Sequence, residues 1–375
     1  MSEVRAIERD AFLALGPDEM ADSVRRGGNV TTHMVERIRL LATLGRPRTC
    51  VPGLLAYALG YSYTGVAPSF RVVLGAALSL AIGFSANLHN TATDLQEDSH
   101  NLPGRVFLVS KVGYDALLRV CRWLGAAMLL GGVLLGAHFA VFMALAVAGL
   151  HQYSAPPVRS KGRPLLGLWV FAQAVVFPFL FGWTTAPGDM LSTLLRSLSS
   201  PWLGHAPPAE AALESYRYLG MWFFLTLWFM AKGTFKNVPD FEGDRAAGVR
   251  TSATVFGTRR SAALVSTAVT IAAYTALSGL VALGFEKPRV LLALLWLVPV
   301  TWNAVQLIRA DASAHSNRLL KTDMLLSSGF IASLLLLVAT TWMSVAFVLA
   351  GAFLLFGSDL FGLDSRREAH VRAPA

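Results

Sequence analysis

Two short clusters of oxygen-bearing side chains stand at the ends of long apolar stretches. In "NTATDLQED", Asn90, Asp94 and Asp98 are spaced by four, so on a helix they lie along one face. In "PDFEGD", Asp240 and Asp244 repeat that spacing. Like charges four residues apart destabilise a helix by about 0.2–0.5 kcal/mol unless a cation lies between them. Each cluster therefore predicts a cation-binding site.

The neighbouring residues indicate which cation binds and with what ligand. Carboxylate and amide oxygens, without a set of histidines and cysteines of the kind zinc prefers, suit Mg²⁺. Lys236, Arg105 and Arg250 lie close by in sequence and would repel a lone cation. Acids and bases together suit a magnesium–diphosphate, in which the acids hold the metal and the bases bind phosphate oxygens. Solvated loop acids are the alternative, and the presence of two clusters disfavours it. Glu97 points off the shared face, and we expect it to be solvated.

A third polar segment, "HQYSAPPVRSKGRP", follows another apolar stretch. Its two prolines end the helix, with Tyr153 and Ser154 just before them and Arg159 and Lys161 just after. We expect Arg159 and Lys161 to bind the diphosphate. Tyr153 and Ser154, together with Arg46, are candidates for positioning the phosphates or a second substrate that would act as acceptor. A loop that only anchors the chain at the membrane interface is the alternative.

The composition predicts a membrane protein. Of the 375 residues, 54% are hydrophobic and only 15% are charged, whereas soluble domains carry about 25% charged residues. The formal net charge of +9 comes mostly from short loops between apolar stretches, which is the pattern of the positive-inside rule and not of a nucleic-acid-binding protein. Cys50 and Cys121 lie in or beside apolar stretches and imply neither a disulfide nor a metal site.

Nine windows of mostly apolar residues predict membrane-spanning helices. The windows are 50–66, 71–93, 115–134, 137–154, 165–185, 215–235, 261–284, 288–308 and 325–343. From Leu325 to Ser358 no residue is charged, and these 34 positions would extend about 50 Å as one helix. Since a bilayer core is about 30 Å thick, we expect either two helices, hence a tenth span, or one projecting helix.

Lysine and arginine concentrate in alternate loops, which sets the expected orientation. The loops after the second, fourth, sixth and eighth windows carry most of these charges, so they and the amino terminus are predicted to be cytoplasmic. We expect the protein to be integral to the plasma membrane, with both acid clusters on its cytoplasmic side. We expect a polar cytoplasmic segment over 1–40, a transmembrane domain over 41–362 and a tail over 363–375.

At these residues the chain resembles the UbiA superfamily of intramembrane prenyltransferases. Asn90, Asp94 and Asp98 resemble its Asn-x-x-x-Asp-x-x-x-Asp motif, and Asp240 and Asp244 its second motif. "YSAPPVRSK" is similar to its tyrosine loop, and "LGRPRT" to the Arg-Pro that opens its first helix. The resemblance implies an all-helical bundle of about nine spans around a central cavity. It also implies Mg²⁺ held with an isoprenoid diphosphate, and a prenyl chain in an apolar tunnel open to lipid.

Two departures bear on the substrate. Thr91 follows Asn90 where many members have Asp, and Asn237 follows Lys236 where many again have Asp. Both changes remove a carboxylate but keep the spaced acids, so Mg²⁺ binding remains expected and the choice of substrate stays open.

The expected reaction is transfer of a prenyl group to a small aromatic or quinone-like acceptor in the bilayer. Two alternatives use the same diphosphate site: C5 elongation of a carotenoid or another polyene, and cyclisation of the prenyl diphosphate. A solute transporter is a remote alternative, because the acids lie at helix ends and not near the bilayer midplane. A carbocation would need aromatic walls. Candidates for them are Phe84, Trp222, Phe223, Phe224, Trp228 and Phe229.

Overall fold

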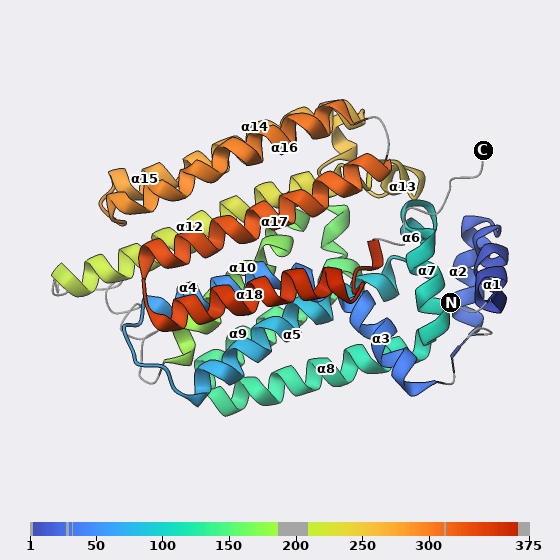
Figure 1. Ribbon diagram of the computed structural model, residues 1–375, viewed down its shortest axis with the longest axis horizontal. Coiled ribbons are helices and arrows are strands. Elements are labelled where there is room, and N and C mark those ends of the chain that lie inside the picture. The colour runs from blue at the N-terminus through green and yellow to red at the C-terminus, as the bar shows by residue number, and fades with distance from the viewer. Residues whose placement is uncertain (1–2, 28–29, 32, 187–208, 311–312, 367–375) are drawn as a thin grey trace.

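The computed structural model describes the chain except for residues 1–2, 28–29, 32, 187–208, 311–312 and 367–375. All regular elements in the described part are helices (Figure 1). The predicted all-α fold is therefore confirmed.

Seven helical segments in the described part are long and apolar enough to cross a membrane. They are Phe70–Thr93 (α5), Tyr114–Leu135 (α8), Pro164–Thr185 (α10), Arg259–Ala282 (α14 and α15), Pro288–Arg309 (η4 and α16), His315–Val338 (within α17, Ser313–Val338) and Trp342–Leu360 (α18). Three further helices occupy the remaining predicted windows: α4 (Val51–Ser62), α9 (Ala137–Ser154) and α12 (Ala209–Asn237). The chain is an integral membrane protein.

The long uncharged stretch forms two helices, one of the two expected outcomes. α17 ends at Val338 and α18 begins at Trp342. The hydroxyl of Thr341 accepts a hydrogen bond from the Ser344 amide at 3.1 Å and so caps α18, a role that threonine commonly fills.

The centre of the bundle is the short helix α4, which is buried over nearly its whole length. Two glycines let it approach α10 closely. A Cβ on Gly60 would lie 2.0 Å from the Phe179 carbonyl oxygen, and one on Gly182 would lie 2.0 Å from the Tyr57 carbonyl oxygen. Small residues at such contacts let backbones approach closely, as is common in membrane helices.

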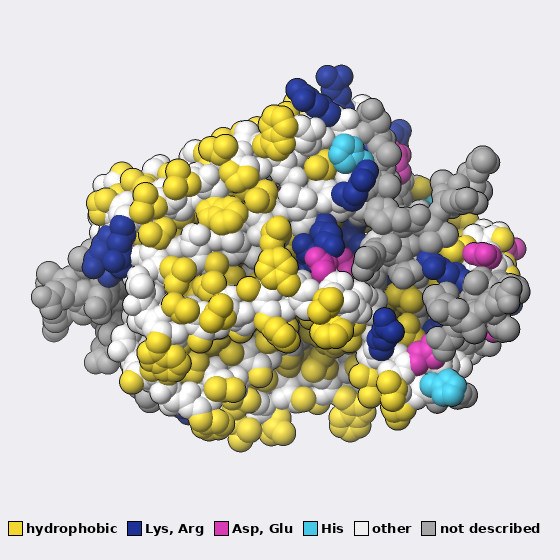
Figure 2. Space-filling model, viewed as in Figure 1, with side chains coloured by type: hydrophobic (Ala, Val, Ile, Leu, Met, Phe, Trp, Pro, Cys, Tyr) yellow, Lys and Arg dark blue, Asp and Glu magenta, His cyan; other side chains and the backbone are white. Residues whose placement is uncertain are grey.

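The outer surface is apolar, as expected where lipid is the solvent. Figure 2 shows hydrophobic side chains spread over one face of the bundle, with most acidic and basic side chains toward one end. Exposed examples are Trp123, Leu349 and Phe353, at 75%, 64% and 72% exposure.

Short helices gather at the polar end of the bundle (Figure 1). They include α6 (Leu95–Asn101), α7 (Pro103–Val112), α13 (Phe241–Ala246) and the 3₁₀ turn η2 (Ser160–Gly162). The N-terminal helices α1 (Glu3–Leu13), α2 (Pro17–Arg26) and α3 (Met34–Gly45) cover the same end, and α2 packs against α6 and α7. These elements position the polar site.

Candidate active site

The first acid cluster crosses the junction of α5 and α6. α5 ends at Thr93, and Asp94 stands between the two helices. Even so, the Asp94 amide bonds the Asn90 carbonyl and the Asp98 amide bonds the Asp94 carbonyl, both at 2.8 Å. Because the helical hydrogen bonds continue, Asn90, Asp94 and Asp98 follow one another as the spacing predicts.

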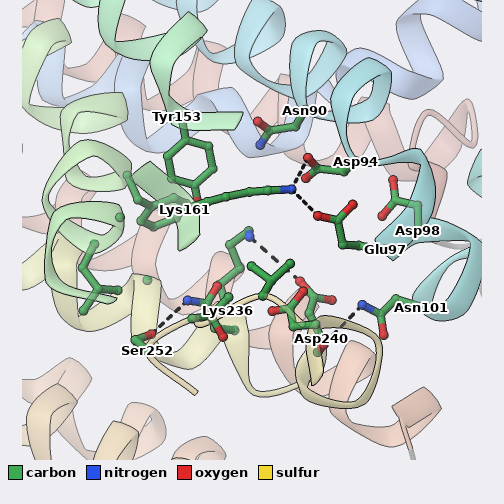
Figure 3. Close-up of a pocket in the computed structure, with 18 of the residues that line it drawn as sticks. Asn90, Asp94, Glu97, Asp98, Asn101, Tyr153, Lys161, Lys236, Asp240 and Ser252 are labelled. Atoms are coloured by element: carbon green, nitrogen blue, oxygen red, sulfur yellow. Dashed lines mark hydrogen bonds and ion pairs between the residues drawn. The ribbon is translucent and has the colours of Figure 1, made fainter. Parts of the chain in front are cut away.

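The second cluster is joined to the first by Asn101. The Asn101 side chain donates to the Asp240 carbonyl at 3.2 Å and accepts from the Gly243 amide at 3.0 Å (Figure 3). A Cβ on Gly243 would lie 2.3 Å from Asn101 side-chain atoms, so a glycine is needed where α13 meets α6. Two segments about 140 positions apart in sequence thereby line the same cavity.

This polar cavity brings together most of the predicted site. Its lining includes an amide and acids from the two clusters and bases from five parts of the chain: Asn90, Asp94, Glu97, Asp98, Asp240, Asp244, Arg46, Arg105, Lys161, Lys236 and Arg366. In Figure 3 the first cluster and Asp240 lie on opposite sides, and Lys161 and Lys236 extend into the space between them. Acids and bases are balanced, as a ligand with both a metal and a phosphate requires.

The first-cluster acids are held by bases. Lys161 pairs with Asp94, and its ammonium also lies 2.9 Å from Glu97. Arg105 pairs with the buried Asp98. Arg159 lies 2.5 Å from Glu97, whose side chain is 5% exposed. The expectation that Glu97 is solvated was therefore wrong: η2 folds against α6 and buries it under two cations.

On the other wall, Asp240 is held by Arg366. Its two carboxylate oxygens accept from Arg366 Nη2 at 3.0 and 2.8 Å, and the Lys236 ammonium lies 3.9 Å away. Burial alone raises the pKa of Asp240, but Arg366 and Lys236 outweigh burial and lower the pKa to about 2. This carboxylate is ionised at neutral pH.

In two other acids of the cavity the pKa is raised and not lowered. Burial, and then the charge of Asp240, raise the pKa of Asp244 to about 7. Burial raises the pKa of Asp98 to about 6 against the opposing effect of Arg105. With no metal ion bound, the pKa of both carboxyls lies well above the usual range for an acid.

The Asp244 shift predicts a pH dependence of stability. Its pKa is about 7 in the folded protein and about 3.9 when unfolded. The raised pKa contributes stability that is present below about pH 4 and lost as pH rises through 7. In EDTA, we expect Asp244→Asn to flatten the fall of the melting temperature between pH 5 and 8. Glu242→Gln, at an exposed acid of the same helix, should keep the unmodified slope. Equal slopes in all three proteins would contradict this assignment.

Some predicted residues lie outside the cavity wall. Arg250 is exposed, although its neighbours Val249 and Thr251 line the cavity. Ser154 is buried, and its hydroxyl donates to Asn90 Oδ1 at 2.7 Å, so it orients the amide from behind. Arg159, with 46% of its side chain exposed, reaches the site only through Glu97.

Mg²⁺ fits this donor set. Asp98 Oδ2 and Glu97 Oε2 are buried oxygens without a hydrogen-bond partner. Among the described residues no three His, Cys, Asp or Glu side chains are gathered as a ready-made metal site. The acids instead face each other as two groups, which suits a hard ion whose remaining ligands are water and phosphate.

An apolar cavity opens from the polar one. Arg46, Asn87, Asn90, Tyr153, Phe171, Lys236 and Arg366 line both. Farther in, the walls include Ile82, Ala146, Leu150, Phe177, Phe229 and Met324. A diphosphate bound in the polar cavity would therefore have an apolar space beside it.

The aromatic walls are only partly those expected. Phe229 lines the apolar cavity and stacks on Phe171, with ring centroids 5.0 Å apart. Phe224 and Trp228 instead belong to the packed core, and Phe223 is 57% exposed. Helical periodicity could not show which face of α12 meets α10.

Lys232 and Asp323 form a buried ion pair on the wall of the apolar cavity, which sequence reasoning missed. The Lys232 ammonium lies 2.7 Å from Asp323 Oδ1, and the two side chains are 4% and 5% exposed. Lys232 gave a signal, since it lies inside the predicted span 215–235, where a lysine is rare and commonly marks function.

Comparison with known proteins agrees with the fold. The UbiA prenyltransferase family matches residues 49–329. The chain belongs to this family, which confirms the resemblance seen in its motifs.

Among curated relatives, a lycopene elongase/hydratase of Haloarcula japonica is 30% identical over 226 residues, covering 58% of this chain and 67% of that protein. Another, of Haloferax volcanii, is 34% identical over 132 residues, covering 34% and 31%. Among solved structures, a UbiA homologue of Archaeoglobus fulgidus bound to GPP and Mg²⁺ shares the fold. Its TM-score is 0.56 at 19% identity, over 82% of this chain and 99% of that one.

Proposed function

We propose that the protein uses Mg²⁺ to transfer a prenyl group from an isoprenoid diphosphate to an apolar acceptor in the bilayer. One observation carries this proposal: a polar cavity lined by both acid clusters opens directly into an apolar cavity. The first suits a metal–diphosphate and the second suits hydrocarbon chains. The Mg²⁺-bound and GPP-bound homologue supports it.

The proposed roles follow from the two walls. Asn90, Asp94 and Asp98 on one wall, and Asp240 and Asp244 on the other, would hold Mg²⁺, which when bound helps neutralise the departing diphosphate. Bases within the cavity would bind phosphate oxygens: Arg46, Arg105, Lys161 and Lys236. Lys161 now pairs with Asp94. Binding therefore requires an exchange of partners, from acid–base pairs to acid–metal and base–phosphate pairs.

The proposed transfer exchanges a C–O bond of the donor for a new C–C bond to the acceptor. The allylic C–O bond breaks and its electrons leave with the diphosphate. The acceptor's π electrons form the new C–C bond, and the proton lost from the acceptor passes to the diphosphate or a carboxylate. The apolar cavity excludes water from the cation, and the stacked Phe171 and Phe229 offer ring faces to it.

We propose a polyene as the first choice of acceptor, because curated relatives in three haloarchaea are named lycopene elongase/hydratase. An aromatic or quinone-like acceptor is the second candidate. Polar side chains on the wall of the apolar cavity favour this second candidate, because they suit an acceptor that carries oxygen. They are Asn87, Gln173 and Ser327.

Radiolabelled dimethylallyl and geranyl diphosphates, offered to purified protein with a polyene, a quinone precursor or no acceptor, test this proposal. We expect a labelled C–C-linked product with the polyene, and a smaller amount or none with the aromatic. Product from the aromatic alone would replace the first candidate by the second. A cyclised hydrocarbon formed without acceptor would overturn transfer.

We also propose that the polar end faces the cytoplasm of the plasma membrane, as the loop charges predict. Cysteine introduced at the exposed Arg250 should react with a membrane-impermeant reagent only from the cytoplasmic side.

A further inference from the structure

The chain returns to the active site after α18. α18 ends at Leu360, and the described residues that follow bring Arg366 back to the wall shared by the two cavities. Arg366 is 7% exposed. Its position is unlike that of an ordinary charge in a terminal tail.

Ion pairs with two parts of the chain fix this return. Asp359 lies 2.8 Å from Arg48 Nη1 and 2.7 Å from the Lys321 ammonium. Asp364 lies 3.5 Å from Arg46 Nε. Because the anchors reach the start of the bundle as well as α17, the segment is held from two directions.

Arg366 contacts the second acid cluster through one nitrogen of its guanidinium. Nη2 donates to both oxygens of Asp240, and Nη1 lies 2.5 Å from Asn317 Oδ1. Nε is buried and has no hydrogen-bond partner. Arg105, on the wall of the same cavity, also carries a buried Nε without one. Leaving a buried charged donor unsatisfied is costly, so two beside one cavity suit an anionic ligand with many oxygens.

We propose that Arg366, supplied by the C-terminal segment, is a diphosphate-binding residue of the active site. Its guanidinium holds the Asp240 carboxylate in place, and donates to a diphosphate oxygen when the substrate binds. The C-terminal segment is therefore part of the catalytic machinery. This inference rests on the proposed diphosphate site.

The test measures binding as well as turnover. Isothermal titration of the full chain in detergent, with inorganic diphosphate and Mg²⁺ as the probe, gives the affinity directly. We expect Arg366→Ala to weaken binding by about tenfold or more, as expected for a charge-assisted bond. In the transfer assay the KM for the prenyl diphosphate should rise, while the KM for the acceptor stays unchanged.

Lys321→Ala is the matched control. It removes the same charge and one anchor of the segment, but Lys321 does not line the polar cavity. It should leave the diphosphate affinity unchanged. A purely structural role for the segment predicts that both variants lower the melting temperature and that neither changes diphosphate affinity.

The outcomes separate this inference from the function it rests on. If the unmodified protein binds diphosphate and Arg366→Ala binds it equally, Arg366 only latches the segment and the proposal falls. If the unmodified protein does not bind diphosphate, the proposed function fails as well. Should Arg366→Ala not fold, Arg366→Lys keeps the positive charge but loses the planar guanidinium that can donate two parallel hydrogen bonds. Its affinity must still fall, and an unchanged value overturns the proposal.

Discussion

Asp94→Asn and Asp240→Asn are each expected to lower kcat/KM for the prenyl diphosphate by about 1000-fold. Each substitution keeps the side-chain shape and removes the charge that would hold Mg²⁺ against the departing diphosphate. Losing one preorganised electrostatic contact typically costs 10²–10³ in rate, and a displaced metal adds to that loss. Steady-state kinetics with a labelled donor measures the effect.

Glu242→Gln is the matched control for these two variants. Glu242 lies on α13 between the two acids of the second cluster, but its side chain is exposed. It should keep kcat/KM within about twofold, since exposed charges contribute little. Equal losses in Glu242→Gln and Asp240→Asn would show that net charge at this end, and not a metal-binding geometry, controls the reaction.

Asp323→Asn is expected to lower the free energy of unfolding by about 3–5 kcal/mol, because it leaves a buried ammonium without its partner. The Lys232 side chain is only 4% exposed, so water cannot replace the lost carboxylate. Reversible denaturation in mixed micelles, followed by circular dichroism, measures the change.

A double substitution separates the ion pair from packing. Lys232→Met with Asp323→Leu removes both charges and keeps an apolar wall. We expect its stability to return close to that of the unmodified protein, because replacing a buried pair by apolar residues is often neutral or stabilising. If the double variant is as unstable as Asp323→Asn, side-chain shape and not charge carries the effect.

The spans were largely predictable because bilayer thickness imposes a length that composition reveals. The 34 uncharged positions from Leu325 to Ser358 exceed one crossing, and the structure divides them between α17 and α18. The close contact of α4 with α10 was not predictable. It depends on Gly60 and Gly182 meeting a particular neighbour, which no local pattern encodes.

The acid clusters were predictable because their spacing of four carries a chemical meaning on a helix. Residues that reach the site through long-range contacts were not. Arg366 looked like a loop charge in a terminal tail, and Glu97 looked solvated on a helix considered by itself. Arg250 shows the reverse case. It lies close to Asp244 in sequence and was predicted to join the site, yet its side chain is exposed.

The most direct test of the magnesium–diphosphate site is the metal dependence of diphosphate release from a labelled prenyl diphosphate. We expect release to stop in EDTA, to return on adding Mg²⁺, and to stay near background in Asp94→Asn and Asp240→Asn. Release that continues in EDTA, or at the unmodified rate in both variants, would contradict the proposal that the two acid clusters hold the metal–diphosphate.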